Sequence, residues 1–169
     1  MLAGLLCWGC KQTDVTQVLD RAETCMAERP DSSLYLLRTL DKRHISGSLR
    51  KARYALLYSQ ALDKNYIDVD NDSLIRVAVD YYKGHGTSHE KALAYFYLGR
   101  VYDNAGDETR ATEAFVEAET HALDTDDHYI CGLIYSYLGN LYFSQYSFDE
   151  ALAMYDKSEK CYALSLIHI

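Results

Sequence analysis

Two stretches of this chain carry the same pattern of residues at a constant distance. One runs over residues 93–119 and the other over residues 132–160. The equivalent residues, each pair 40 positions apart, are Tyr95 and Tyr135, Leu98 and Leu138, Gly99 and Gly139, Tyr102 and Tyr142, Ala111 and Ala151, and Phe115 and Tyr155. Chance does not readily produce an offset that is kept over six positions. The chain is therefore built from repeated units, each of which must pack against the next.

The spacing within the first half of each unit predicts a helix. Tyr95, Leu98, Gly99 and Tyr102 follow one another at steps of three, one and three residues, which places them on one helical face. A glycine inside a helix costs about 1 kcal/mol relative to alanine. We therefore expect Gly99 to lie where a neighbouring helix approaches closely.

The second half of each unit predicts the helix that makes this approach. Ala111 is small enough to belong to the same contact, and Phe115 lies one turn further along, where it would fill the space beside it. Between the two halves, Gly106 suits the end of the first helix and Asp107 suits the cap of the second. Each unit is thus predicted to be a helical hairpin.

The motif Y-x-x-L-G-x-x-Y, followed by A-x-x-x-F/Y, resembles the signature of the tetratricopeptide repeat (TPR) family. The resemblance is strong over about 88–160 and weaker over about 13–85. Family repeats have 34 residues, so about six extra residues are expected in the connection at 123–128. The resemblance implies an all-α fold, namely a right-handed α-α superhelix (a TPR-like solenoid) of about four helical hairpins.

The predicted organisation has three parts. Residues 1–12 form an apolar leader, residues 13–163 form the TPR-like repeat domain, and residues 164–169 form an unstructured or foreign tail. In the earlier part of the domain the pattern is divergent, but Ala78 and Tyr82 still follow A-x-x-x-F/Y. The hairpins are predicted at about 14–41, 48–84, 88–122 and 127–161.

The composition agrees with long helices and argues against one class of partner. The chain has a single proline, Pro30, and nine glycines, too few for a β fold rich in tight turns. Pro30 itself suits the first turn of a helix. The net charge is −8, from 25 acidic and 17 basic side chains, and no basic stripe stands out that would bind phosphates. Nucleic acid is therefore not expected as a partner.

The first ten residues bear on where the protein is found. Residues 1–9 are almost wholly apolar but too few to span a bilayer, which takes about 20 apolar residues. The segment Cys7-Trp8-Gly9-Cys10 resembles a bacterial lipobox, which implies lipidation at Cys10. The alternatives are an uncleaved apolar leader, or redox or metal chemistry at the C-x-x-C pair. Lipidation predicts a lipoprotein of the bacterial cell envelope that faces the periplasm and meets the membrane only through its lipid anchor; without it, the expected location is cytoplasmic.

Two further segments resemble TPR-containing lipoproteins and membrane regulators of Bacteroidetes. They are A-L-D-K-N-Y-I-D at 61–68 and L-G-R-V-Y at 98–102. Members of that group often continue into more repeats, a membrane helix and a regulatory or DNA-binding part. The apolar end at 164–169, where a solenoid should carry a polar capping helix, suggests that the chain is a fragment.

Two clusters match metal-binding motifs only in part. Asp68, Asp70 and Asp72 alternate as in a calcium loop, but the glycine and the glutamate that such a loop needs are absent, so helix capping is the preferred interpretation. His85 and His89 lie in a glycine-containing turn without the glutamate of a zinc-binding H-E-x-x-H helix. No metal and no cofactor are expected. Nucleophile and phosphate-binding motifs are also missing, so we do not expect an enzyme.

The TPR resemblance implies a concave groove lined by the first helix of each hairpin. The residues between the core positions would face a ligand there, although plain solvent exposure is an equally simple interpretation. The predicted partner-binding residues are Phe96, Arg100, Asp103, Ser136, Asn140 and Phe143. Their mixture of aromatic and hydrogen-bonding groups indicates a protein partner bound as an extended peptide or a helix. The predicted function is a protein–protein interaction scaffold; the alternatives are the sensor half of a larger signalling or transcription regulator, and self-association through exposed apolar ends.

Overall fold

A computed structural model describes residues 14–167 of the chain, and the regular secondary structure of this part is all helical. It contains no strand, which confirms the predicted all-α class. A short 3₁₀ helix, Lys42–His44, precedes the third α-helix. The α-helices are α1 (Val15–Cys25), α2 (Pro30–Arg38), α3 (Ser48–Lys64), α4 (Ser73–His85), α5 (Ser88–Asn104), α6 (Glu108–Ala122), α7 (His128–Ser144) and α8 (Phe148–Ile167).

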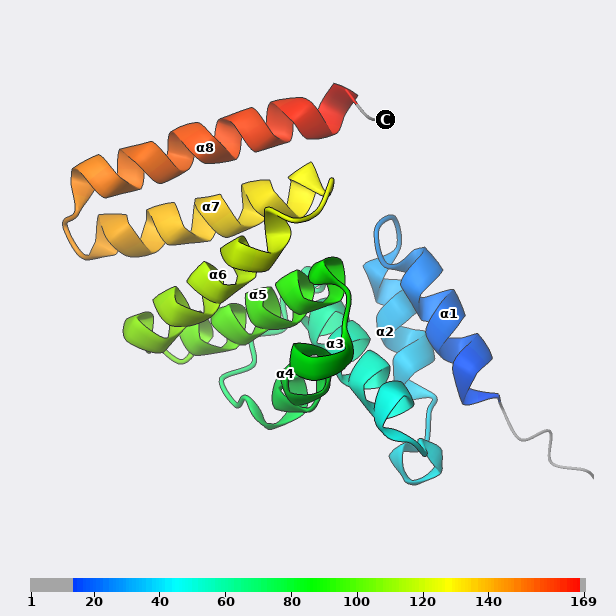
Figure 1. Cartoon of the computed structure of the whole chain (residues 1–169). Coiled ribbons are helices and arrows are strands. Elements are labelled where there is room, and N and C mark those ends of the chain that lie inside the picture. The colour runs from blue at the N-terminus through cyan, green and yellow to red at the C-terminus, as the bar shows by residue number, and fades with distance from the viewer. Residues whose placement is uncertain (1–13, 168–169) are drawn as a thin grey trace, which may run out of the picture.

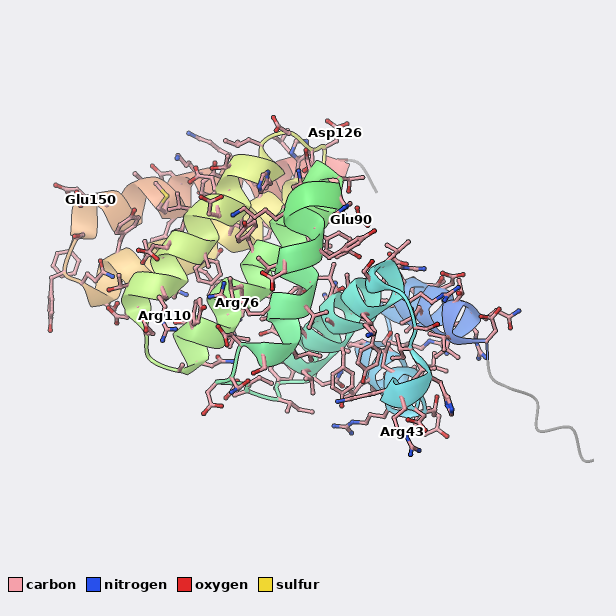
Figure 2. All side chains as sticks on the ribbon, turned by 60° about the horizontal axis from the view of Figure 1, so that its bottom comes forward. Arg43, Arg76, Glu90, Arg110, Asp126 and Glu150 are labelled. Atoms are coloured by element: carbon pink, nitrogen blue, oxygen red, sulfur yellow. The ribbon has the colours of Figure 1, made fainter. Side chains whose placement is uncertain are left out.

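The helices pack in chain order as four successive pairs (Figure 1). The pairs are α1–α2, α3–α4, α5–α6 and α7–α8. Each begins within one residue of a predicted hairpin, but α8 continues to Ile167, past the predicted end at 161. The first helix of each pair also contacts the first helix of the next, from α1 to α3, α5 and α7. The array therefore has two ends, and Figure 2 shows Arg43 near one of them and Glu150 near the other.

Polar side chains accept hydrogen bonds from backbone N–H groups at the starts of several of these helices. At the start of α5, the Thr87 hydroxyl accepts a hydrogen bond from the Glu90 N–H at 3.2 Å, and the Glu90 carboxylate accepts one from the Thr87 N–H at 2.9 Å. Asp107 and Asp127 each accept from the backbone N–H three residues further on, at 3.0 Å, at the starts of α6 and α7. These bonds satisfy N–H groups that a helix leaves unpaired at its first turn. The predicted capping role of Asp107 is confirmed.

The 40-residue register also appears in the backbone of the hairpin turns. Tyr66, Gly106 and Tyr146 are each 40 positions apart, and all three have positive φ angles, of 56°, 73° and 62°. A left-handed residue ends a helix by turning the chain back on itself. The repeat therefore reaches into the second hairpin, α3–α4, where side chains alone show it less clearly.

The repeated glycines lie where two helices of one hairpin approach most closely. Gly99 of α5 faces the ring of Phe115 in α6, and Gly139 of α7 faces the ring of Tyr155 in α8. A Cβ atom added to either glycine would lie 2.6 Å from a ring carbon. The expected reason for the glycine, close approach of a neighbouring helix, is confirmed.

The core consists of two apolar clusters that meet at α3. One lies among α1, α2 and α3 and includes Leu19 and Leu57, and the other extends from α3 to α7 and includes Leu56 and Phe115. Because adjacent leucines on α3 point to different clusters, this helix joins the first hairpin to the rest of the array. In repeat proteins each unit depends on its neighbours to bury its apolar surface.

Two expectations differ from the structure. Residues 164–167 continue α8 rather than forming an unstructured tail, because the helix carries apolar residues on through Leu164 and Leu166. Asp72 precedes α4, but its side chain does not cap the helix; Asn71 accepts the hydrogen bond from the Ser73 N–H instead, at 3.0 Å. The predicted leader at 1–12, with Cys10, and residues 168–169 lie outside the described part of the chain.

Candidate functional site

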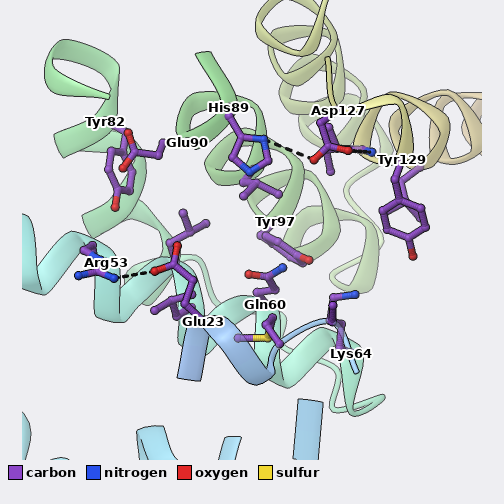
Figure 3. A pocket seen from close by; sticks show the side chains of 17 residues that line it. Glu23, Arg53, Gln60, Lys64, Tyr82, His89, Glu90, Tyr97, Asp127 and Tyr129 are labelled. Carbon is purple, nitrogen blue, oxygen red and sulfur yellow. Dashed lines mark hydrogen bonds and ion pairs between the residues drawn. The ribbon is translucent and has the colours of Figure 1, made fainter. Parts of the chain in front are cut away.

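The first helices of the hairpins surround a hollow of about 280 Å³ (Figure 3). Side chains from α1, α3, α5 and α7 line it, together with Tyr82 of α4. On α5 and α7 the lining residues belong to the first half of the helix or to the residue before it, except Tyr97, which lies just past the middle of α5. The lining of these two helices consists of His89, Glu90, Leu93, Tyr97, Asp127, Tyr129, Ile130 and Leu133.

The hollow follows the internal repeat of the sequence. Three of its α5 residues have α7 counterparts that lie 40 positions later and also line it. These pairs are His89 and Tyr129, Glu90 and Ile130, and Leu93 and Leu133. Equivalent turns of α5 and α7 thus form one wall of the hollow, and α1 and α3 complete it with other turns.

The floor of the hollow is apolar. Leu56 and Leu57 of α3 and Ile130 of α7 are buried, and Leu93 and Leu133 are half-buried on the walls. These side chains also belong to the core or pack against it, so the floor is held in place by the packing of the array. An apolar side chain of a partner would find a preformed contact surface here.

The rim carries charges that tie neighbouring helices together. The Arg53 guanidinium of α3 donates to Asp20 at 2.9 Å and to Glu23 at 2.6 Å, both on α1. His89 of α5 lies 3.4 Å from the Asp127 carboxylate at the start of α7. The Arg53 contacts join α3 to α1, and the His89 contact joins α5 to the start of α7. They therefore fix the distances between the helices that surround the hollow.

Two polar side chains of the hollow, Lys64 and Gln60, make no ion pair within residues 14–167. The Lys64 ammonium lies over the ring of Tyr129, 5.8 Å from its centroid, and takes part in none of the ion pairs found among residues 14–167. Gln60 points toward Tyr97 (Figure 3), whose pKa is raised by burial, so its hydroxyl stays neutral. An amide, a neutral phenol and an ammonium suit hydrogen bonding to a peptide better than acid–base chemistry.

The six residues predicted to bind a partner do not line this hollow. For Phe96 the prediction is wrong. Its side chain is only 1% exposed and packs against the rings of Phe115 and Tyr137 at centroid distances of 5.7 and 5.6 Å. Phe96 is a core residue of the α5–α6–α7 contact.

Arg100 and Asp103 are close together, but they serve the contact between α3 and α5. Arg100 donates to Asp63 of α3 and to Asp103, both at 2.8 Å, and its guanidinium lies 4.3 Å from the centroid of the Tyr137 ring. Its side chain is 15% exposed. Burial raises the pKa of Asp103, and the charge of Arg100 opposes that effect. We interpret this group as a structural ion-pair network.

The three predicted residues of α7 lie near α8 instead. The hydroxyls of Ser136 and Ser158 are 2.7 Å apart, and Asn140 accepts a hydrogen bond from the Tyr155 hydroxyl at 2.9 Å. Phe143 is exposed beside Phe148 at the α7–α8 turn. They are thus divided between the α7–α8 interface and the end of the hairpin.

The predicted partner-binding residues lie on two helices that do line the hollow, α5 and α7, but they are not the residues that line it. The hollow lies mainly at the first halves of α5 and α7, and five of the six predicted residues lie further along these helices. The sixth, Phe96, is next to the lining residue Tyr97 but is buried in the core. The sequence does contain a signal for the hollow, namely the side chains 40 positions apart at 89 and 129, 90 and 130, and 93 and 133. That signal is weak because the members of two of these pairs differ in chemistry.

No protein-family model matches this sequence, and a search of curated proteins finds no significant relative. The resemblance to tetratricopeptide repeats therefore depends on the residues of the chain itself. Within residues 14–167, no three His, Cys, Asp or Glu side chains gather as a metal site would require. No helix in the same part of the chain has both the length and the apolar character to cross a membrane.

Proposed function

We propose that this chain is a protein-interaction scaffold that binds a peptide or a helix of its partner in the hollow between α1, α3, α5 and α7. The observation that carries the proposal is the hollow between four successive first helices, in which equivalent turns of α5 and α7 form one wall. It combines a preformed apolar floor with polar groups that make no ion pair among the described residues, the usual arrangement of a recognition site. The proposed array is a TPR-like superhelix, supported by the register of Gly99 and Gly139 against aromatic rings.

The chemistry of the hollow indicates what a bound peptide would present. A Leu-sized or aromatic side chain would rest on Leu57, Leu93 and Leu133. Gln60 would hydrogen-bond the peptide backbone, since an amide side chain offers both a donor and an acceptor. Lys64 would favour an acidic side chain next to the apolar one, because the free ammonium lies at the edge of the same hollow.

A displayed library of short random peptides, panned on the purified chain, tests this proposal. We expect enriched peptides to pair an apolar residue with an acidic one and to lose binding to Leu93→Glu and Lys64→Glu. Leu123→Glu is the matched control, because Leu123 is an exposed apolar residue that does not line the hollow. Enriched peptides that bind all three variants equally would show that the hollow is not the binding site.

We also propose that the scaffold is tethered to a membrane through lipid on Cys10, on the strength of the lipobox-like segment 7–10. Metabolic labelling with palmitate in a bacterial host, compared with Cys10→Ala, tests the tether. Label that depends on Cys10 supports it, and label that survives the substitution contradicts it.

A further inference from the structure

The α7–α8 hairpin contains two cysteines, one on each helix. Cys131 of α7 is 7% exposed, Cys161 of α8 is half-buried, and both are free thiols. Forty positions earlier, their counterparts in the α5–α6 hairpin are Lys91 and His121. The repeat itself therefore does not require a small apolar side chain at either place, and the cysteine pair is a separate feature of this hairpin.

The contacts between α7 and α8 show how the two cysteines lie relative to each other. Across this interface, the Lys157 ammonium lies 4.8 Å from the centroid of the Tyr135 ring. Cys131 precedes Tyr135 by four residues, and Cys161 follows Lys157 by four. Because the two helices run antiparallel (Figure 1), four residues back on α7 and four residues on along α8 lead to the same level of the hairpin. The cysteines therefore face each other one turn away from the contact of Lys157 with Tyr135.

The two helices also approach each other closely at this level. The Ser158 hydroxyl donates to the Gly132 carbonyl oxygen at 2.9 Å, and a Cβ atom added to Gly132 would lie 2.6 Å from the ring of Tyr162. Gly132 directly follows Cys131, and Tyr162 directly follows Cys161. A disulfide requires Cα atoms no more than about 7 Å apart. Close approach of the helices beside both cysteines favours a bridge between side chains as short as these.

The two thiols interact with each other, and they differ in reactivity. Burial raises the pKa of the Cys131 thiol to about 11, and the interaction with Cys161 adds to this effect. Burial also raises the pKa of Cys161, but the contact with Cys131 and the charge of Lys157 oppose it. Because the thiolate is the reactive form, Cys161 is the cysteine of the pair that reacts first with an external reagent.

We propose that Cys131 and Cys161 form an oxidisable dithiol that closes to a disulfide between α7 and α8. With a small-molecule disulfide as the oxidant, the Cys161 thiolate attacks one of its sulfurs, forms a mixed disulfide and releases one thiolate. The Cys131 thiolate then attacks the Cys161 sulfur and releases the second thiolate. The chain gives up two protons and two electrons, and the oxidant is reduced to two thiols.

The bond would fasten the second half of α8 to the first turn of α7. It closes a loop of about 30 residues, and a cross-link over such a loop disfavours the unfolded chain. We therefore expect the oxidised chain to unfold at a temperature about 5–15 °C above that of the reduced chain. A reductant should reverse this rise. The expectation does not depend on what the hollow binds.

Oxidation of the purified full chain by oxidised glutathione at mildly alkaline pH, followed by peptide mapping, tests the proposal. Trypsin cleaves after Lys157 and Lys160, so it separates the two cysteines into different peptides. After the remaining thiols are blocked, mass spectrometry should find the peptide 111–157 linked to the peptide 161–169. The oxidised chain should keep the size of a monomer on a gel without reductant, because the bond lies within one chain.

Two serine variants complete the test. Cys161→Ser should give no linked peptide and no rise in the unfolding temperature on oxidation. Cys25→Ser is the matched control, since Cys25 is also half-buried but lies on α1, and it should change neither result. Circular dichroism would establish that both variants keep their helix content.

Three results of the oxidation would overturn the pairing of Cys131 with Cys161. They are glutathione that stays on Cys161 without transfer to Cys131, a cross-link between two chains, and a link from either cysteine to another one. A linked pair that leaves the unfolding temperature unchanged would contradict the fastening of α8 to α7.

Discussion

A Cβ atom on Gly99 would lie 2.6 Å from the Cδ1 and Cε1 atoms of Phe115. The ring cannot retreat, because Phe115 is fully buried and is held between Phe96 and Tyr137. The distance between α5 and α6 therefore depends on the missing side chain of Gly99. The same relationship recurs 40 residues later between Gly139 and Tyr155, with one difference that can be measured: Tyr155 is partly exposed.

We expect Gly99→Ala to lower the free energy of unfolding by about 2 kcal/mol. Overpacking of a core lowers the free energy of unfolding by about 1–3 kcal/mol. The higher helix propensity of alanine offsets about 1 kcal/mol of this loss. The overpacking cost should lie near the top of its range, since Phe115 is fully buried between the rings of Phe96 and Tyr137. Urea denaturation followed by circular dichroism measures the change.

Two other glycines serve as controls for that measurement. Gly139→Ala should cost less than Gly99→Ala, because the Tyr155 ring can swing outward. Gly84→Ala should raise the free energy of unfolding by up to about 1 kcal/mol, since a Cβ atom there meets nothing within 4 Å. Equal losses at all three positions would show that the distance to the neighbouring ring is not what determines the effect.

The left-handed turn residues give a second prediction. Gly106→Ala should lower the free energy of unfolding by about 1 kcal/mol, because its φ of 73° is unfavourable for a residue with a Cβ atom. Tyr66→Gly should not lower it, since Tyr66 has a φ of 56° and a side chain that is 94% exposed, so little burial is lost. Thermal unfolding of the two variants, compared with the wild type, decides this. A large loss with Tyr66→Gly would mean that its ring has a packing role.

The ion-pair network of Arg100 gives a third prediction. Arg100→Ala should lower the free energy of unfolding by about 2 kcal/mol, less than the roughly 3–5 kcal/mol of a fully buried pair, because Asp63 and Asp103 remain 22% and 32% exposed. Arg110→Ala is the control: its side chain is 55% exposed, so the loss of its pair with Asp107 and of its contact with the Tyr102 ring should have a much smaller effect. Equal effects would show that the partial burial of Arg100 contributes nothing.

Asp72 makes the stability of the α4–α5 contact depend on pH. The Tyr102 hydroxyl donates to Asp72 at 2.8 Å and Arg76 donates to it at 3.0 Å, and these bonds lower the pKa of Asp72 below its ordinary value of 3.8. A lowered pKa in the folded state stabilises the fold above pH 3.8, and this contribution is lost as the pH falls through the folded-state pKa.

The difference in free energy of unfolding between the wild type and Asp72→Asn should therefore be constant near neutral pH and shrink as the solution is acidified below about pH 4. Urea titrations at a series of pH values measure it. A difference that does not change with pH would mean that the charge of Asp72 is not involved.

Much of the fold was predictable because its cause is local. The spacing of Tyr95, Leu98, Gly99 and Tyr102 defines a helical face by itself, and Asp107 caps the next helix through a bond that spans three residues. Repetition of that pattern 40 residues later gives the number and order of the hairpins at the C-terminal half. These features follow from periodicity and turn chemistry, which operate over a few neighbouring residues.

The site was less predictable because it depends on contacts between residues that are far apart in the sequence. Phe96 has the sequence position of a groove residue, yet it is buried because Tyr137, 41 positions later, lies against it. Likewise, Arg100 is drawn into an ion pair with Asp63 of α3, and the hollow forms where α3 meets the first turns of α5 and α7.

The sequence by itself thus determined the helices, their pairing and the close contacts at the repeated glycines, since each depends on residues near one another in the chain. Only the tertiary structure decided which turns line the hollow and which aromatic rings are buried. These depend on the angle and distance at which one hairpin packs on the next, and many side chains far apart in the sequence set that geometry together.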